Sequence, residues 1–496
     1  HDPQRPLFRT VPLEPHEQRR PSAFAELTRR LETWLTTQAD TADAADVARY
    51  AGGERPVTLH VTHSWGGGVA RWIETWIDAD TDTVNLQLRA EGPQTGQGCG
   101  QRYSLYLSNR LDAPLASWWL QPPILSTGES NAAYREMLNG ILERYGIGRV
   151  IVSSLVGHSL DALATDRPTL QVLHDYYPAW PLLGVHPGPW LREGKPVDLD
   201  TALKTHDLLP ELSDLDAAGW RALAARWHDT VASKKVALVA PSHSVIDLLR
   251  RIDPAWADRS IEMVPHGLPE LPGRQTVAPR ERDDGRLRLV VPGRINDGKG
   301  RQLLLDALPE LRRYAHVYLV GADRYGHAFF GRAGVDVILQ FRRESLRELL
   351  AGIGPHAAGL LSVVPETFSY TLTEMQQLDI PVIATRVGSL EERIRDGETG
   401  WLIEPDAASL VEKVRVLHEN RAEIASVREN LATAGLPTLD GMLERYAGVC
   451  PPVTAARRID ALAGLQDAQA SALAGLYRET KAGLRRLEAE ADALQE

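Results

Sequence analysis

The sequence predicts an α/β protein built from two doubly wound domains in tandem. Short β-branched runs alternate with helical patterns from residue 57 onward, which is typical of a parallel sheet covered by helices. The alternation stops at a polar stretch with several prolines and then restarts, and we read that stretch as a hinge. Helical segments flank the pair. The expected parts are an N-terminal helical extension (1–55), a first domain (56–270), a linker (271–286), a second domain (287–440) and a C-terminal helical extension (441–496).

Strands are expected wherever a short apolar run is bounded by turn residues. In the first domain these runs are 57–63, 83–88, 104–107, 149–153, 169–174, 236–241 and 261–265. In the second domain they are 287–292, 317–320, 335–339, 359–364, 381–385 and 400–404. An insertion at 176–230 is rich in Pro, Trp and Gly. We interpret its aromatic residues as local core, with a groove for an acceptor molecule as the alternative.

The two ends of the chain show helical periodicity. At the N-terminus, 22–35 carries apolar residues along one side of a helix. At the C-terminus, 459–496 has a loosely heptad pattern, which predicts either a coiled coil or a helix packed on its own domain. A coiled coil would oligomerise the protein or space it within a larger multidomain synthase. Because the chain begins at His1, it is also a candidate fragment of a longer protein.

Composition narrows the class of protein. The 496 residues carry 24% charged and 43% hydrophobic residues, as soluble globular proteins do. A formal net charge of -11 argues against a nucleic-acid partner. No apolar run is long enough for a transmembrane span, and Cys99 and Cys450 form no metal or redox motif. We expect a cytoplasmic protein, with peripheral attachment to the inner membrane as the alternative.

The stretch 364–404 carries the most chemistry. Glu366 and Glu374 flank a turn rich in hydroxyl groups, and a helix is expected to begin in it near Ser369 or Thr371. Free N–H groups and partial positive charge at a helix start suit a diphosphate, and the glutamates suit the hydroxyls of a sugar or ribose. The alternative is a capping box, in which Glu374 only bonds back to the Thr371 backbone.

Other candidates follow the ends of predicted strands. The first strand leads into Gly66, Gly67 and Gly68, a turn that lets phosphate oxygens approach bare N–H groups, or is merely tight. In the second domain, Arg294 and Lys299 follow the first strand, where ligands of open α/β sheets bind. Arg offers a fork to phosphate oxygens and Lys a point charge.

Two histidines and a Ser-His-Ser run have weaker signals. His174 and His266 each end a strand, where a structural role is the more common one. Ser242, in the Ser-His-Ser run, is interpreted as a helix N-cap rather than as part of a catalytic pair. No GxSxG, HExxH or paired CxxC motif is present, so neither a hydrolase elbow nor a metal site is predicted.

Taken together, these motifs resemble the retaining group 1 glycosyltransferases (GT4), whose fold, GT-B, has two Rossmann-like domains. The resemblance covers about 57–440, and its most specific part is PETFSYTLTEM followed by IPVIATRVGSLEERI. GRINDGKG and HSWGGG resemble two further family motifs. The run LQVLHDYYPAWP resembles members that build bacterial surface polysaccharides such as O-antigen, capsule or lipopolysaccharide. Thr367 departs from the usual glycine, which leaves the sugar open.

The resemblance implies a role for each matching residue. Glu366 would hold hydroxyls of the donor sugar, and Glu374 the ribose. Arg294 and Lys299 would neutralise the leaving diphosphate without a divalent metal, and His174 would lie near the transferred sugar. The phosphate cradle would be completed by Phe368, Ser369, Tyr370 and Thr371, with Gly66, Gly67 and Gly68 facing them.

The expected reaction is transfer of a sugar from a nucleotide sugar to a saccharide acceptor. No cofactor is expected, and whether the donor carries UDP, GDP or dTDP stays open. Two other functions are also open: a sugar-nucleotide epimerase or hydrolase of the same fold, and a non-catalytic module of a larger glycan synthase.

Overall fold

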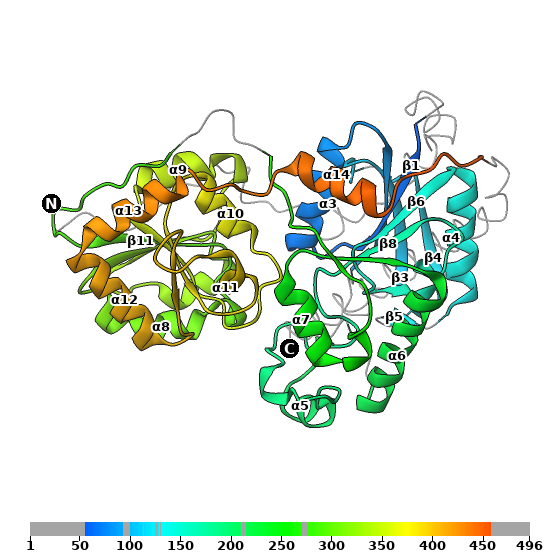
Figure 1. The fold of residues 1–496 in the computed structure, drawn as a ribbon, viewed down its shortest axis with the longest axis horizontal. Coiled ribbons are helices and arrows are strands. Elements are labelled where there is room, and N and C mark those ends of the chain that lie inside the picture. The colour runs from blue at the N-terminus through cyan, green and yellow to red at the C-terminus, as the bar shows by residue number, and fades with distance from the viewer. Residues whose placement is uncertain are drawn as a thin grey trace, which may run out of the picture.

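A computed structural model describes residues 55–457, except 93–99, 113, 125–126, 129, 210–211, 213–214 and 270–275. Within these limits the chain forms two α/β domains side by side (Figure 1). The helical patterns at 22–35 and 459–496, the N-terminal extension and Cys99 lie outside the described residues. The described cysteine, Cys450, is buried and unpaired.

The first domain is built on a sheet of eight described strands in the order β10-β9-β8-β6-β1-β2-β3-β4. Every strand predicted in this domain is present. The strands are β1 Val57–His63, β2 Val84–Ala90, β3 Gly100–Leu107, β4 Ala116–Ile124, β6 Ile147–Val152, β8 Thr169–Val172, β9 Ala237–Ala240 and β10 Glu262–Met263, with a small separate pair, β5 Thr127–Gly128 and β7 His158–Ser159.

One edge of this sheet differs from the prediction. The strands from β10 to β2 run parallel, but β3 is antiparallel to β2, and β4 is antiparallel to β3. Only a short turn joins β3 to β4, and a parallel pair would need a crossover of a dozen or more residues. The sequence analysis missed β4 because its Pro122 and Pro123 are untypical of strands; an edge position tolerates them.

Helices cover both faces of the first sheet. The insertion between β8 and β9 folds against it, and its Trp180, Trp220 and Trp227 are buried in the main core. The interpretation of these aromatics as local core is therefore confirmed. The helices are α3 Gly67–Ala79, α4 Ala132–Arg144, α5 Leu199–Thr205, α6 Ala217–Lys234 and α7 His243–Ile252.

The second domain has six described strands, all parallel, in the order β13-β12-β11-β14-β15-β16. The order reverses beside β11, and the crevice at such a reversal is where ligands of open sheets bind. The strands are β11 Leu287–Pro292, β12 Ala315–Val320, β13 Val335–Ile338, β14 Ala357–Leu360, β15 Val382–Thr385 and β16 Trp401–Ile403. The helices are α8 Arg301–Leu311, α9 Leu346–Ile353, α10 Tyr370–Gln377, α11 Ser389–Arg393, α12 Ala407–Glu419 and α13 Arg421–Leu431.

The chain then returns to the first domain. Helix α14, Leu439–Val449, lies beside α3 (Figure 1). Tyr446 of α14 is buried with its ring centroid 5.5 Å from that of Trp72 and 5.0 Å from that of Trp76. The predicted boundary at residue 440 thus falls within α14. This helix follows the second domain in sequence and packs on the first domain. Among the described helices, none is both long and apolar enough to cross a membrane.

Several histidines of the first domain are buried, and this makes the free energy of unfolding depend on pH. Burial lowers the pKa of His60, His63 and His158 from 6.5 to about 4. Between about pH 4 and pH 6.5, the native state therefore binds fewer protons than the unfolded chain. Their contribution to stability is complete above pH 6.5 and is lost as the pH falls toward 4.

We expect the free energy of unfolding to fall between pH 7.5 and 5.5 by about 1 kcal/mol for each such histidine. The buried Asp175 carboxyl, whose pKa burial raises to about 6, opposes this in part. Urea unfolding followed by tryptophan fluorescence at both pH values measures the change. The variant His60→Asn should lose about one histidine's share of the pH dependence. Equal stability at the two pH values would contradict the prediction.

Candidate functional site

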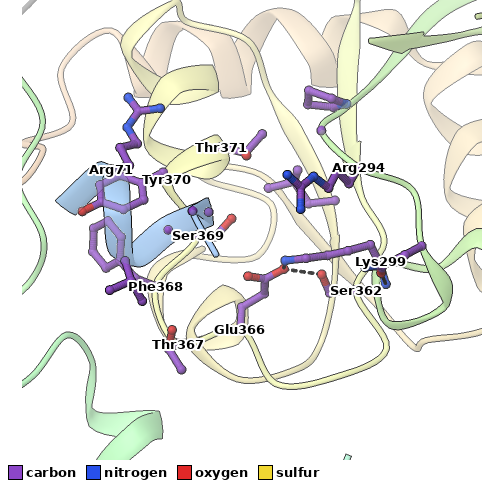
Figure 2. Close-up of a pocket in the computed structure, with 18 of the residues that line it drawn as sticks. Arg71, Arg294, Lys299, Ser362, Glu366, Thr367, Phe368, Ser369, Tyr370 and Thr371 are labelled. Atoms are coloured by element: carbon purple, nitrogen blue, oxygen red, sulfur yellow. Dashed lines mark hydrogen bonds and ion pairs between the residues drawn. The ribbon is translucent and has the colours of Figure 1, made fainter. Parts of the chain in front are cut away.

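A cavity of about 750 Å³ lies between the two domains. It is bordered by the turn between β1 and α3 on one side, and by segments that follow β11 and β14 on the other. Parallel strands deliver these segments to the carboxyl ends of both sheets. Figure 2 shows the residues of the second domain grouped around it, with α3 of the first domain behind them.

The glycine turn leaves open space on the cavity wall. Gly66 and Gly67 have φ values of 77° and 76°, in the left-handed region where side chains are strained. A Cβ atom added to Gly66, Gly67 or Gly68 would meet nothing within 4 Å. These glycines are therefore not required by packing inside the first domain. They leave room at the start of α3, where N–H groups have no intrahelical partner.

Lys299 and Glu366 form an ion pair inside the cavity (Figure 2). Ser362 also donates to the carboxylate through its hydroxyl. Burial by itself would raise the pKa of Glu366, but the charge of Lys299 and these hydrogen bonds bring it below its ordinary value. Glu366 is therefore an ionised acceptor at neutral pH. Lys299 is held at the end of a short turn, where its N–H donates to the Asn296 side chain at 3.0 Å.

Arg294 is the least engaged of the cavity's cations that the sequence predicted. Its side chain is 64% exposed, and its nearest described carboxylate, Asp323, lies 3.6 Å away. In Figure 2 it extends toward the same space as Lys299. A long, exposed guanidinium of this kind is able to turn to an anionic ligand at little cost, because it breaks no tight ion pair.

Arg393 fixes the backbone of segment 366–371 through hydrogen bonds. The guanidinium donates to the carbonyl oxygens of Phe368 and Ser369 and, at 2.7 Å, to the hydroxyl of Thr373. It also lies 3.8 Å from the Phe368 ring centroid. Ser369 is left-handed, with φ 66°, and α10 begins immediately after it. The N–H groups of the first turn of α10 are thereby presented at the cavity.

Glu374 lies behind this turn and does not line the cavity. It pairs with Arg71 of α3, with 2.6 Å between Oε1 and Nη1, and with Arg343 of the second domain. The capping-box alternative is wrong, because the N-cap of α10 is Ser369 and no side chain caps it. Burial raises the pKa of Glu374, and the charge and hydrogen bond of Arg343 offset this only in part.

His174 and His266 meet at the first domain's side of the cavity, with ring centroids 5.1 Å apart. Burial lowers the pKa of His174 to about 3, so its imidazole is neutral at physiological pH. Its Nε2 is buried and has no hydrogen-bond partner among the described residues. A neutral imidazole at the cavity wall with an unpartnered nitrogen is able to exchange a hydrogen bond with a ligand hydroxyl if its ring turns toward the cavity.

Ser242 occupies the N-cap position of α7, as predicted, but its hydroxyl does not cap the helix. It donates instead to the Thr367 carbonyl of the second domain at 2.9 Å. The cap comes from Glu392, also of the second domain, which accepts from the N–H groups of His243 and Ser244 at 3.0 and 2.9 Å. The second domain thus satisfies a helix end of the first.

All but one of the predicted site residues line the cavity, Glu374 being the exception. The sequence analysis missed four contributors. Arg71 lies one helical turn beyond the glycines, a spacing visible in the sequence. The sequence carries no sign that the other three lie at the site, because each comes from a separate segment of the second domain: Arg343, Ser362 and Arg393. Among the described residues, no three His, Cys, Asp or Glu side chains gather as a metal site would require.

Comparison with known proteins identifies relatives of the second domain. Residues 286–420, which make up most of that domain, match the family of glycosyl transferases group 1. A curated relative, D-inositol 3-phosphate glycosyltransferase 1 of Catenulispora acidiphila, is 32% identical over 181 residues, covering 30% of this chain and 42% of the relative. The group 1 resemblance predicted from the motifs is thus confirmed, although the match spans less than half of that relative.

Solved structures confirm the GT-B fold of this chain. Sucrose-phosphate synthase from Thermosynechococcus elongatus has a TM-score of 0.52 at 14% identity, covering 80% of this chain and 98% of that one. Anabaena Alr3699/HepE in complex with UDP has a TM-score of 0.50 at 13% identity, covering 79% and 98%. At such identities the likeness establishes the fold alone.

Gly388 positions Glu366, and a substitution there tests this. A Cβ at Gly388 would lie 2.6 Å from the Glu366 carbonyl oxygen, and its φ is 57°. Gly397 has a similar φ of 78°, but a Cβ there meets nothing within 4 Å. We expect Gly397→Ala to cost about 1 kcal/mol from backbone strain, and Gly388→Ala to cost roughly 1–3 kcal/mol more from the clash.

Urea unfolding of both variants measures the difference. Gly397→Ala is the control, because Gly397 also has a positive φ but lacks the close approach. Equal losses of stability in the two variants would show that the contact with Glu366 does not constrain this loop.

Proposed function

We propose that this protein is a retaining glycosyltransferase that moves a sugar from a nucleotide sugar to a saccharide acceptor. The observation that carries the proposal is the joint placement of Arg294, Lys299 and Glu366 around one cavity at the carboxyl ends of both sheets. Cations and free N–H groups suit a diphosphate, and an ionised carboxylate beside them suits sugar hydroxyls.

The proposed chemistry begins with cleavage of the bond between the sugar C1 and the diphosphate oxygen. Positive charge develops on the sugar while negative charge builds on the leaving diphosphate. Arg294, Lys299 and the N–H groups at the start of α10 would stabilise the negative charge on the diphosphate oxygen that leaves C1. Preorganised donors of this kind are each worth about 3 kcal/mol of barrier.

The pair of Lys299 and Glu366 is proposed to open when the donor enters. Lys299 would turn to the diphosphate, and Glu366 would accept hydrogen bonds from the sugar. Ser362 would keep the carboxylate in place during this exchange. Retention at C1 would follow from front-face attack, with the leaving phosphate taking the acceptor's proton. Exclusion of water between the domains would protect the donor from hydrolysis.

UDP is the first donor nucleotide to test, because the structural relative HepE was solved with UDP. GDP and dTDP sugars follow. For the acceptor, the motif resemblance favours a bacterial surface polysaccharide, whereas the name of the curated relative points to D-inositol 3-phosphate.

Substitution of the ion pair tests the catalytic proposal. Lys299→Ala and Glu366→Gln should each lower kcat at least about a hundredfold, as loss of one transition-state contact does. Sugar transfer measured by mass spectrometry with a UDP-sugar panel reports this. Arg301→Ala is a matched control, since Arg301 pairs with Asp297 at the surface, outside the cavity. Full activity in Glu366→Gln would contradict the assigned role.

Product analysis in the same assay separates the alternative enzymes. A new sugar nucleotide would indicate an epimerase, and free sugar released at full rate without an acceptor would indicate a hydrolase. Absence of any nucleotide affinity would indicate a non-catalytic module.

The open space at Gly68 provides an independent test. Because Gly68 is helical and a Cβ there meets nothing, Gly68→Ala should leave the free energy of unfolding unchanged or raise it by up to about 1 kcal/mol. A methyl group facing a bound diphosphate should weaken UDP binding by about 1–3 kcal/mol. Calorimetric titration with UDP measures the affinity.

Gly352→Ala is the control for that variant. Gly352 is also helical and unobstructed, but it lies on α9 outside the cavity. It should gain similar stability with unchanged UDP affinity. Unchanged UDP affinity in Gly68→Ala would instead remove the glycine turn from the donor site.

A further inference from the structure

Arg71 has a position that the proposed mechanism does not use. It lies on α3 one turn after Gly67 and Gly68, at spacings of four and three residues, and therefore on the same helix face. It lines the cavity together with them. The first domain thus places a guanidinium directly beside the turn that is proposed to receive the diphosphate.

The present partner of Arg71 is a carboxylate that has a second cation. Glu374 Oε1 lies 2.6 Å from Arg71 Nη1 and also accepts from Arg343. The Arg71 guanidinium lies 5.0 Å from the centroid of the Tyr370 ring, and Figure 2 shows it beside that ring. If Arg71 turned away, Arg343 would still neutralise Glu374. Release of Arg71 would therefore not leave an unpaired buried carboxylate, which is the costly outcome.

The charge of the cavity favours such a release. Arg71, Arg294, Lys299 and Arg343 line it, whereas its lining carboxylates are Glu74 and Glu366. Glu374 pairs with two of these cations, so one positive charge remains in excess, which suits an anionic ligand. A phosphate oxygen pair also matches the planar fork of an arginine, which a single carboxylate oxygen engages only in part.

We propose that Arg71 is a donor-positioning residue that exchanges Glu374 for the diphosphate when a nucleotide sugar binds. This rests on the proposed function and adds a partner from the first domain to it. Glu374 then stays paired with Arg343 through the same oxygen, Oε1. Because Arg71 belongs to α3 and the diphosphate is held by the second domain, the exchange also ties donor binding to contact between the domains.

Calorimetry with UDP, UMP and uridine tests the exchange. Arg71→Gln is expected to weaken UDP binding at least about tenfold, to weaken UMP binding less, and to leave uridine binding unchanged. Arg71→Lys, which keeps the charge without the fork, is expected to recover part of the UDP affinity. Arg135→Gln, the same change at an exposed site on α4 outside the cavity, should leave UDP binding unaffected.

If Arg71 only orients Glu374 and does not contact the phosphates, a different pattern of affinities is expected. In that case Arg71→Gln weakens UDP and uridine equally, and it has no effect once Glu374→Gln is present. Persistence of the UDP-specific loss in the Glu374→Gln background supports a direct phosphate contact. The proposal is overturned if Arg71→Gln weakens UDP and uridine binding equally, or if it weakens UDP binding neither alone nor in the Glu374→Gln background.

The same titrations separate this inference from the proposed function. If the wild-type protein binds none of UDP, GDP and dTDP, the nucleotide-sugar function fails and the inference fails with it. If GDP or dTDP binds in place of UDP, the series is repeated with that nucleotide, its monophosphate and its nucleoside. If the wild type binds a diphosphate and Arg71→Gln binds it equally well, the inference alone fails. Thermal melting of each variant verifies its folding, and Arg71→Lys supplies the decision should Arg71→Gln unfold.

Discussion

Both sheets of this protein end at the same cavity, and this constraint organises the whole site. A parallel strand delivers the following loop to its carboxyl end, so the parallel strands of two sheets that face each other collect loops from distant parts of the chain. The glycine turn after β1 and the ion pair of Lys299 with Glu366 are brought together in this way. Without that opposition, each would be an ordinary surface turn.

Carboxylates pair with most of the positive charge at the cavity. Lys299 pairs with Glu366, and Arg71 and Arg343 pair with Glu374. These pairs fix the positions of the cations. In the proposed reaction they are also the groups that a diphosphate and a polyol separate, since each partner has a matching group on a nucleotide sugar. Under that proposal, the same side chains serve stability and ligand affinity.

The contact between the domains is made by residues whose partners no motif specifies. Glu392 caps a helix of the other domain, and Tyr446 of α14 packs among the tryptophans of α3. Glu392 lies inside the motif IPVIATRVGSLEERI, but the sequence does not show which helix it caps, and α14 reads as part of a terminal extension. Their roles depend on how the two domains meet, which no local pattern encodes.

The sequence by itself determined the alternation of strands and helices, the two-domain plan, and the identity of most cavity residues. It did so because strand ends, glycine turns and the segment around Glu366 and Glu374 are local patterns with direct physical meaning. Only the tertiary structure decided that Glu374 faces two arginines instead of capping its helix, that β3 and β4 run antiparallel, and that Arg71 joins the site. Each of these depends on a partner distant in sequence, and local propensity does not specify such a partner.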